Sequence, residues 1–299
     1  MHLPLALLLA TPLLALEYPH QPADSQPVGW PLTAEERAYV VEKPEFDRRP
    51  GRESNKHLPQ LWPVVPTAGH WGGTSWLDTH TKLVHYVQAN GGPVDILLVG
   101  DSITQQWGSP LDKGILNEPW MKAFPTYKTI NIGIGGDKTQ NVLWRLDHGG
   151  VEGLNPRSIV LMIGNNNMFF SPETGAAAAA QGVKACLQNL RGKFPEAEVV
   201  VAKILPCHAP KNRFYEDIVL TNAEIDKLNL AADPKVHVLD LAQKFLNEDG
   251  TLKQILFKPD NIHLSSEGYT LYASQLKPLL DAFLGGKGLG PSSVVIPTR

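Results

Sequence analysis

Four short polar segments carry residue types that together could perform acyl transfer through a serine. They are Gly100–Ile103, Asn131–Asp137, Gly164–Asn167 and Asp260–His263. Each follows or closes a short apolar run, so we expect each at the end of a strand, where open α/β sheets bind their ligands. In chain order they supply a hydroxyl nucleophile, hydrogen-bond donors for an oxyanion, and a base with an acid beside it.

Ser102 is the candidate nucleophile. It follows the apolar run Val94–Val99 and precedes a polar stretch. A serine hydroxyl reacts when a base takes its proton, and a strand-to-helix turn can aim backbone N–H groups at developing charge. The plainer interpretation makes Ser102 a helix N-cap. Asp101 could be the acid, although neighbouring residues at a turn usually point apart.

The candidate base is His263. A catalytic histidine needs an acid on its other ring nitrogen. Asp260 stands three residues earlier, where one turn of backbone can bring both side chains to the same side. The chain has ten histidines, and the rivals with poorer surroundings are His80, His148 and His208.

The segment Asn131–Asp137 suits a turn that presents a backbone N–H to an oxyanion. Its glycines admit positive φ and close approach, and they are Gly133, Gly135 and Gly136. The spacing of Asp137 and Gln140 predicts Asp137 as the N-cap of the next helix. A dinucleotide-binding fingerprint would need a further glycine where the chain has Lys138.

Asn166 is a further candidate donor. It follows the apolar run Ile159–Ile163, and its amide could donate a hydrogen bond into the same space. The alternative is that Gly164–Asn167 is simply a favourable turn sequence.

Motifs and charge exclude several other classes. The chain has no His-Glu-x-x-His, Cys-x-x-Cys, P-loop or Gly-x-Ser-x-Gly motif, so we expect no metal or cofactor. Its net charge is −3 and it has no basic stripe, which argues against nucleic acid. With 42% hydrophobic and 19% charged residues it has the composition of a globular protein.

Strand and helix patterns alternate from Trp76 onward, which predicts an α/β fold with a three-layer, doubly wound parallel sheet. The expected strands are continuous apolar runs, as in sheets covered on both faces. They are 94–99, 129–132, 158–163, 198–205 and 236–241, and the expected helices are 76–89, 138–148, 172–193, 215–231 and 265–284.

The two ends of the chain differ from this region. Residues 1–16 contain an apolar run too short to span a bilayer, which suits a signal peptide and a secreted or periplasmic enzyme; the alternative is a cytoplasmic start. Residues 17–73 are rich in Pro and Trp and suggest an extended arm packed on a catalytic domain at 74–284, with one short helix beginning at Thr33. Residues 285–299 have the composition of a tail. Cys186 is expected in the helix 172–193 and Cys207 just after the strand 198–205, and their expected positions along the strand direction are too far apart for a disulfide. Both should therefore be free thiols.

The four segments resemble the GDSL, or SGNH, hydrolase family, and most closely its platelet-activating-factor acetylhydrolase catalytic-subunit branch. The likeness includes Asn131–Asp137 and the following Val142–Leu146, and it spans about Trp76 to Leu284. It implies a flavodoxin-like fold of about five strands, with Ser102 as nucleophile, His263 as base and Asp260 as its acid. It further implies an oxyanion hole made by Ser102, Gly136 and Asn166, and an acyl pocket bounded by Ile103, Asn165 and Ile262.

The expected function is therefore metal-independent hydrolysis of esters. Two isoleucines beside the nucleophile suggest a shallow acyl pocket and hence acetyl groups. The tryptophan-bearing arm suggests an acetylated carbohydrate or a small aryl ester as substrate, and the resemblance suggests an acetyl-phospholipid instead. We expect no stable membrane insertion. An acyltransferase, or a non-catalytic glycan-binding module on the same scaffold, stays open, as does the oligomeric state.

Overall fold

The structure is a computed structural model that describes residues 70–71, 74–108, 116–170, 175–210 and 212–290. The predicted signal peptide, most of the arm including the helix at Thr33, and the end of the tail lie outside the described residues. Among the described helices, none is long and apolar enough to cross a membrane.

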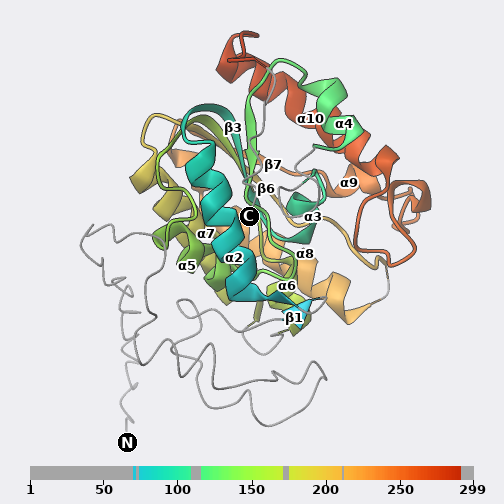
Figure 1. Ribbon diagram of the computed structural model, residues 1–299. Coiled ribbons are helices and arrows are strands. Elements are labelled where there is room, and N and C mark those ends of the chain that lie inside the picture. Colours follow the sequence, from blue (N-terminus) through green and yellow to red (C-terminus); the bar gives the residue numbers. More distant parts are fainter. Residues whose placement is uncertain (1–69, 72–73, 109–115, 171–174, 211, 291–299) are drawn as a thin grey trace, which may run out of the picture.

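Five parallel strands form the central sheet (Figure 1), which confirms the predicted fold class. Their order is β4-β3-β5-β6-β7, the doubly wound order in which the chain reverses direction across the sheet between β3 and β5. The strands are β3 (Gly92–Gly100), β4 (Thr129–Asn131), β5 (Leu154–Met162), β6 (Glu198–Ala202) and β7 (Val236–Leu239). A separate antiparallel pair joins β1 (His70–Trp71) to β2 (Thr74–Ser75).

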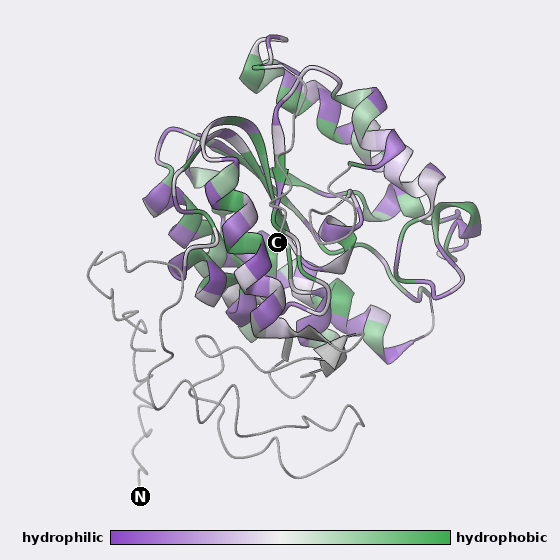
Figure 2. Cartoon of the chain, viewed as in Figure 1, coloured by the Kyte–Doolittle hydropathy of each residue, from purple (hydrophilic) through white to green (hydrophobic). Residues whose placement is uncertain are grey.

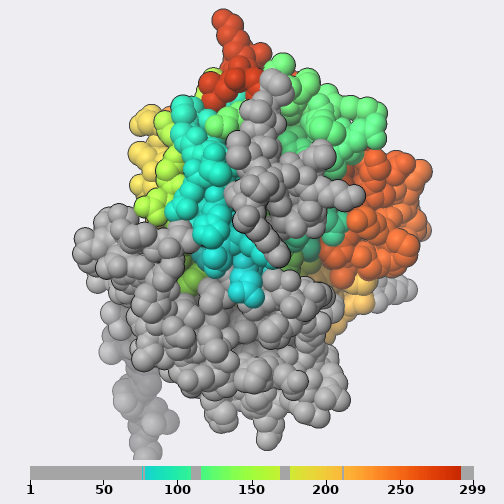
Figure 3. Space-filling view, in the orientation of Figure 1, coloured from blue at the N-terminus to red at the C-terminus, as the bar shows by residue number. Residues whose placement is uncertain are grey.

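Helices cover both faces of this sheet. The α-helices are α2 (Trp76–Ala89), α3 (Ser102–Gln105), α4 (Glu118–Ala123), α5 (Thr139–Asp147), α6 (Asn165–Phe170), α7 (Gly175–Lys193), α8 (Arg213–Lys227), α9 (Ala242–Phe245) and α10 (Ser266–Leu284). Two short 3₁₀ turns, η3 (Leu230–Ala232) and η4 (Gln254–Leu256), complete the described elements. On the face shown in Figure 3, α2 in blue-green, α4 in green and the C-terminal region in orange and red form much of the described surface.

The side chains of β3 point alternately to the two faces of the sheet, and a hydrophobic core lies on each face. Leu97 and Val99 pack into one cluster with α2, α5 and α7, whereas Ile96 and Leu98 pack into the other with α4, α9 and α10. Successive side chains of a strand point to opposite faces, so an unbroken apolar run serves both layers. Figure 2 shows this hydrophobic colouring along the central strands.

The long elements follow the predicted ranges, and the short ones were missed. Helix α2 has the predicted bounds, and α10 begins one residue later than predicted. Strand β5 begins four residues before its predicted start, and β6 ends three residues before its predicted end. Helices α3, α4, α6 and α9 were not predicted, because four to six residues are too few to show a helical period. Cys186 and Cys207 are free and buried, as expected.

Candidate active site

Ser102, His263 and Asp260 form a continuous chain of hydrogen bonds at the carboxyl edge of the sheet. The Oγ of Ser102 lies 2.8 Å from Nε2 of His263, and Nδ1 of His263 lies 2.7 Å from Oδ2 of Asp260. An ionised carboxylate only accepts hydrogen bonds, so the imidazole hydrogen is on Nδ1. Nε2 is then left to accept the hydroxyl proton of Ser102.

The turn after β3 sets the position of Ser102. Asp101 is the N-cap of α3, and its Oδ1 accepts a hydrogen bond from the Ile103 N–H at 3.0 Å. Ser102 is therefore the first helical residue rather than the cap. The Tyr269 hydroxyl donates to the Ile103 carbonyl at 2.7 Å and ties this turn to α10. First-turn N–H groups have no acceptor within the helix, so the Ser102 N–H can bind an anion.

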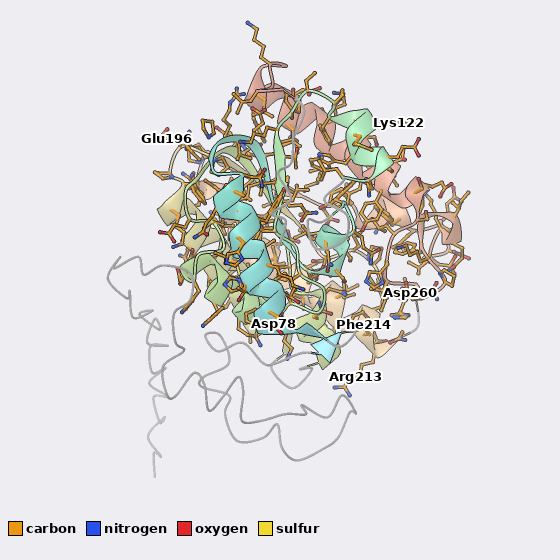
Figure 4. All side chains as sticks on the ribbon, viewed as in Figure 1. Asp78, Lys122, Glu196, Arg213, Phe214 and Asp260 are labelled. Carbon is orange, nitrogen blue, oxygen red and sulfur yellow. The ribbon has the colours of Figure 1, made fainter. Side chains whose placement is uncertain are left out.

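A compact turn holds His263. The Oδ1 of Asp260 accepts the N–H groups of Ile262 at 3.0 Å and His263 at 2.9 Å. Asn261, which lies between Asp260 and Ile262, has φ +57°, and its carbonyl accepts a hydrogen bond from the His208 N–H at 3.1 Å. The turn is thus fixed both by its own carboxylate and by the segment that follows β6. In Figure 4, Asp260 lies near the edge of the molecule, on the same side as Phe214 and Arg213 of α8.

The pKa of Asp260 is set by these contacts. Partial burial raises it, but the hydrogen bonds from the His263 side chain and from the two backbone N–H groups outweigh that effect. The pKa lies below its ordinary value of 3.8. The acid is therefore ionised at neutral pH and can accept from Nδ1 of His263.

The glycine turn after β4 lies against the nucleophile segment. The Gly135 N–H donates to Oε1 of Gln105 at 2.6 Å, and a Cβ on Gly133 would lie 2.4 Å from the Gln105 nitrogen. Only glycine permits this approach. Gly136 has φ +81°, and within the described part of the chain no acceptor binds its N–H. That N–H is therefore available to a ligand.

Asn166 comes from the start of α6, beyond β5. Its Nδ2 donates to the carbonyl of Asp137 at 2.9 Å and lies 3.5 Å from Oδ2 of Asp101, a distance at the limit of a hydrogen bond. One amide hydrogen is thus bound within the protein, and the other has at most a weak partner. The assignment of Asn166, with Ser102 and Gly136, to an oxyanion hole stays a prediction.

Comparison with known proteins identifies the family of this chain. The sequence profile of the GDSL-like lipase/acylhydrolase family matches residues 98–271. Subunit alpha1 of platelet-activating factor acetylhydrolase IB from Homo sapiens is 32% identical over 216 residues, which cover 72% of this chain and 87% of that protein. The chain belongs to the GDSL-like lipase/acylhydrolase family. It is therefore a carboxylic ester hydrolase.

Solved structures share the fold of this GDSL-like hydrolase. A GDSL-like lipase from Bacteroides thetaiotaomicron superposes with a TM-score of 0.55 at 20% identity, covering 68% of this chain and 97% of that one. An acetyl xylan esterase superposes with a TM-score of 0.51 at 23% identity, covering 62% and 99%. At these identities the likeness concerns the fold.

The three residues predicted to bound the acyl pocket differ in exposure. Ile103 has no exposed surface and packs in the core, and Ile262 is partly buried against the same cluster. Asn165 is 4% exposed, and its Oδ1 has no hydrogen-bond partner among the described residues. Ile103 thus belongs to the core in this structure rather than to an open wall. The pocket assignment itself stays a prediction.

The prediction that Asp137 caps the next helix is wrong. The N-cap of α5 is Lys138, whose own N–H donates to Oδ1 of Asn141 at 3.1 Å. The carboxylate of Asp137 instead binds Arg145 and Trp76, and it is completely buried. A buried guanidinium is a stronger partner for a carboxylate than an unpaired backbone N–H.

Two of the rival histidines lie away from the site, and the third, His208, contacts the His263 turn through its backbone N–H. Nε2 of His80 is hydrogen-bonded to the His148 carbonyl, and Nδ1 of His148 is hydrogen-bonded to the Trp144 carbonyl. Both rings are thus held in an aromatic cluster with Trp144, between α2 and the end of α5. Burial lowers the pKa of His80 to about 3, with a smaller contribution from the charge of Arg145. His208 has φ +59° and packs edge-on against Phe214. In the described part of the chain, no group of three or more His, Cys, Asp or Glu side chains could hold a metal ion.

Sequence reasoning also missed supporting residues. Nδ2 of Asn131 donates to the carbonyls of Thr104 and Gly108, both at 2.8 Å, and its Oδ1 accepts from the Gly133 N–H at 2.9 Å. This side chain joins α3 to the glycine turn. Arg145 was missed in the same way. The available signal was an arginine among the apolar residues of 142–146, which marks a buried charge in need of a partner.

Proposed function

We propose that this enzyme hydrolyses esters of short carboxylic acids, acetate above all, through an acyl-serine intermediate. The observation that carries the proposal is the bond of 2.8 Å between Ser102 Oγ and His263 Nε2, in line with the bond of 2.7 Å from His263 to Asp260. A hydroxyl, a base and an orienting acid in this order make an activated nucleophile.

The reaction runs in two halves. Ser102 Oγ attacks the ester carbonyl as its proton passes to Nε2 of His263, which gives a tetrahedral oxyanion. The N–H groups of Ser102 and Gly136 and the Asn166 amide stabilise this anion; losing one such donor typically costs about 10²–10³-fold in rate. The oxyanion collapses, and the alcohol leaves with the proton from His263. A water then gives its proton to His263 and attacks the acyl-serine carbonyl; the second oxyanion collapses, the carboxylic acid leaves, and Ser102 Oγ takes the proton back from His263.

The preference for short acyl groups rests on packing near the nucleophile. Ile103 is the residue after Ser102, is fully buried and is tied through its carbonyl to Tyr269. Ile262 precedes the base and packs on the same cluster. A long acyl chain directed between them would have to displace close-packed side chains, at a cost of typically about 1–3 kcal/mol.

Two classes of ester substrate are proposed, which differ in the alcohol that carries the acyl group. An acetylated carbohydrate or small aryl ester suits an exported enzyme with a tryptophan-bearing arm, the interpretation drawn from residues 1–73. The second candidate is an acetyl-phospholipid. It is favoured by the human relative at 32% identity, whose name denotes an acetylhydrolase of platelet-activating factor.

The decisive test compares the purified enzyme with Ser102→Ala. We expect p-nitrophenyl acetate turnover and covalent fluorophosphonate labelling in the wild type, and neither in the variant. The matched control is Ser274→Ala, which removes an exposed hydroxyl on α10 that donates to the Leu271 carbonyl. It should keep both properties. A wild-type protein that takes up no label would support a non-catalytic binding module and overturn the proposal.

The substrate is resolved by chain length and by acetate release. Initial rates on p-nitrophenyl acetate, butyrate and octanoate should fall with length, and faster turnover of octanoate would contradict the short-acyl proposal. Acetate release from acetylated xylan and from an acetyl-phospholipid then separates the two alcohol components. Added acceptor alcohols would reveal acyl transfer as new ester products.

A further inference from the structure

A completely buried ion pair lies directly behind the glycine turn. Both side chains are 0% exposed, and Oδ2 of Asp137 is 2.7 Å from Nη2 and 2.8 Å from Nε of Arg145. The other carboxylate oxygen accepts from the Trp76 indole N–H at 2.7 Å. Burial raises the pKa of Asp137, and the guanidinium charge opposes that rise. The reaction described above gives neither group a step.

The same guanidinium also binds backbone from two other segments. Nη1 of Arg145 donates to the Ile132 carbonyl at 2.8 Å, and Nη2 approaches the Gly100 carbonyl at 3.4 Å. Gly100 ends β3, two residues before Ser102, and Ile132 leads into the glycine turn. One rigid, planar group therefore connects the nucleophile segment, the end of β4 and the residue after Gly136.

Gly136 needs such support. Glycine has more conformational freedom than any other residue, so the direction of the Gly136 N–H depends on what fixes its neighbours. The next residue, Asp137, is held at its carboxylate by Arg145 and Trp76 and at its carbonyl by Asn166. The Asp137 N–H also donates to the Ile134 carbonyl at 3.2 Å and closes the turn that contains Gly135 and Gly136, so these contacts fix the end of the turn that follows the Gly136 N–H.

We propose that Arg145, acting through Asp137, is a positioning residue that aims the Gly136 N–H at the oxyanion. The inference rests on the proposed function. Its physical basis is preorganisation, because a donor fixed before the reaction needs no reorientation as charge develops. Lysine keeps the charge but lacks the fork that reaches a carboxylate and two carbonyls together.

The test compares Arg145→Lys with Arg191→Lys. Arg191 is a matched control because it also binds a carboxylate and backbone carbonyls, remote from Ser102: Nε lies 2.9 Å from Asp233, and Nη1 bonds the carbonyls of Phe194, Pro195 and Ala197. With p-nitrophenyl acetate, below the melting temperature of every variant, we expect Arg145→Lys to lower kcat about 10- to 100-fold, less than the full loss of a donor. KM should change less than about threefold, as expected when only transition-state binding is lost. Arg191→Lys should leave kcat unchanged.

A second readout separates positioning from general damage. Methylboronic acid forms a reversible bond from boron to Ser102 Oγ while the serine proton passes to His263, and the adduct is a tetrahedral anion that mimics the intermediate. Its affinity should fall by the same factor as kcat/KM in Arg145→Lys, whereas competitive inhibition by acetate should not change. Trp76→Phe removes the indole donor together with part of a buried ring, leaves the Arg145–Asp137 pair in place, and should show a smaller loss of the same kind. It also provides the test if Arg145→Lys fails to fold.

An Arg145→Lys enzyme that folds and keeps kcat within twofold of wild type would overturn the inference, as would unchanged boronate affinity. The same holds for Trp76→Phe when Arg145→Lys does not fold. These failures differ from failure of the proposed function, in which the wild type itself would show neither turnover nor labelling.

Discussion

Replacing Asp260 by asparagine isolates the acid that orients His263. The carboxylate accepts Nδ1–H of His263 through Oδ2 and the N–H groups of Ile262 and His263 through Oδ1. Asparagine keeps one oxygen for the two backbone bonds but presents an NH₂ group to Nδ1. The favoured tautomer then carries its hydrogen on Nε2, which can no longer accept the proton of Ser102.

The size of the effect follows from exposure. In a buried triad the wrong tautomer lowers kcat about 10⁴-fold. Here the side chains of Asp260 and His263 are 45% and 24% exposed, so water can replace part of the lost acceptor. We therefore expect kcat for p-nitrophenyl acetate to fall about 10²–10³-fold. The melting temperature should stay within about 2 °C of wild type, because both backbone bonds remain.

Asp249→Asn is the matched control. Oδ1 of Asp249 accepts the N–H of Thr251 at 2.9 Å and its hydroxyl at 2.6 Å, in an exposed turn with no histidine partner. Its activity should equal that of wild type. If Asp260→Asn keeps more than about a third of wild-type kcat while remaining folded, the tautomer argument from the buried triad does not apply here.

Two further predictions concern the protein around the site. Burial raises the pKa of Asp101 to about 7 from its ordinary 3.8. Protonation of Asp101 therefore contributes its full free energy to the stability of the fold below pH 3.8, and this contribution is lost as the pH rises through about 7. The melting temperature of wild type relative to Asp101→Asn should accordingly decline from pH 4 to 8, and a constant difference would contradict the assignment. Gly133→Ala places a Cβ 2.4 Å from the Gln105 nitrogen, which should cost about 1–3 kcal/mol and lower the melting temperature by at least about 2 °C. Gly192→Ala, where a Cβ meets nothing within 4 Å, should leave the melting temperature unchanged or raise it, and equal behaviour of the two variants would refute the packing argument.

Local patterns made much of the fold predictable. The apolar residues at 94–99 predicted a strand covered on both faces, because apolar side chains on both faces of such a strand pack against the helical layers. The spacing of Asp260 and His263 likewise predicted a bond that the structure has, since a single turn of backbone forms it. Interactions within a few residues leave a signature that sequence reading can find.

Other features needed partners from distant parts of the chain. Asp137 has the spacing of a helix cap, yet it binds Arg145 and the indole of Trp76, which is 61 residues away. The competition between a cap and an ion pair depends on what is buried nearby, and residue spacing does not contain that information. The short helices were missed because contacts with other elements, such as α10 for α4 and α7 and α8 for α6, rather than an amphipathic period, stabilise them.

Sequence alone determined the strand-helix alternation, the local pairing of Asp260 with His263, and membership of a hydrolase family through four short segments. Only the tertiary structure brought Ser102 within 2.8 Å of His263, a residue 161 positions later, and placed Arg145 behind the glycine turn. The physical reason is that parallel strands bring their carboxyl ends to one edge whatever the length of chain between them, while the contacts made there depend on side chains from several elements at once.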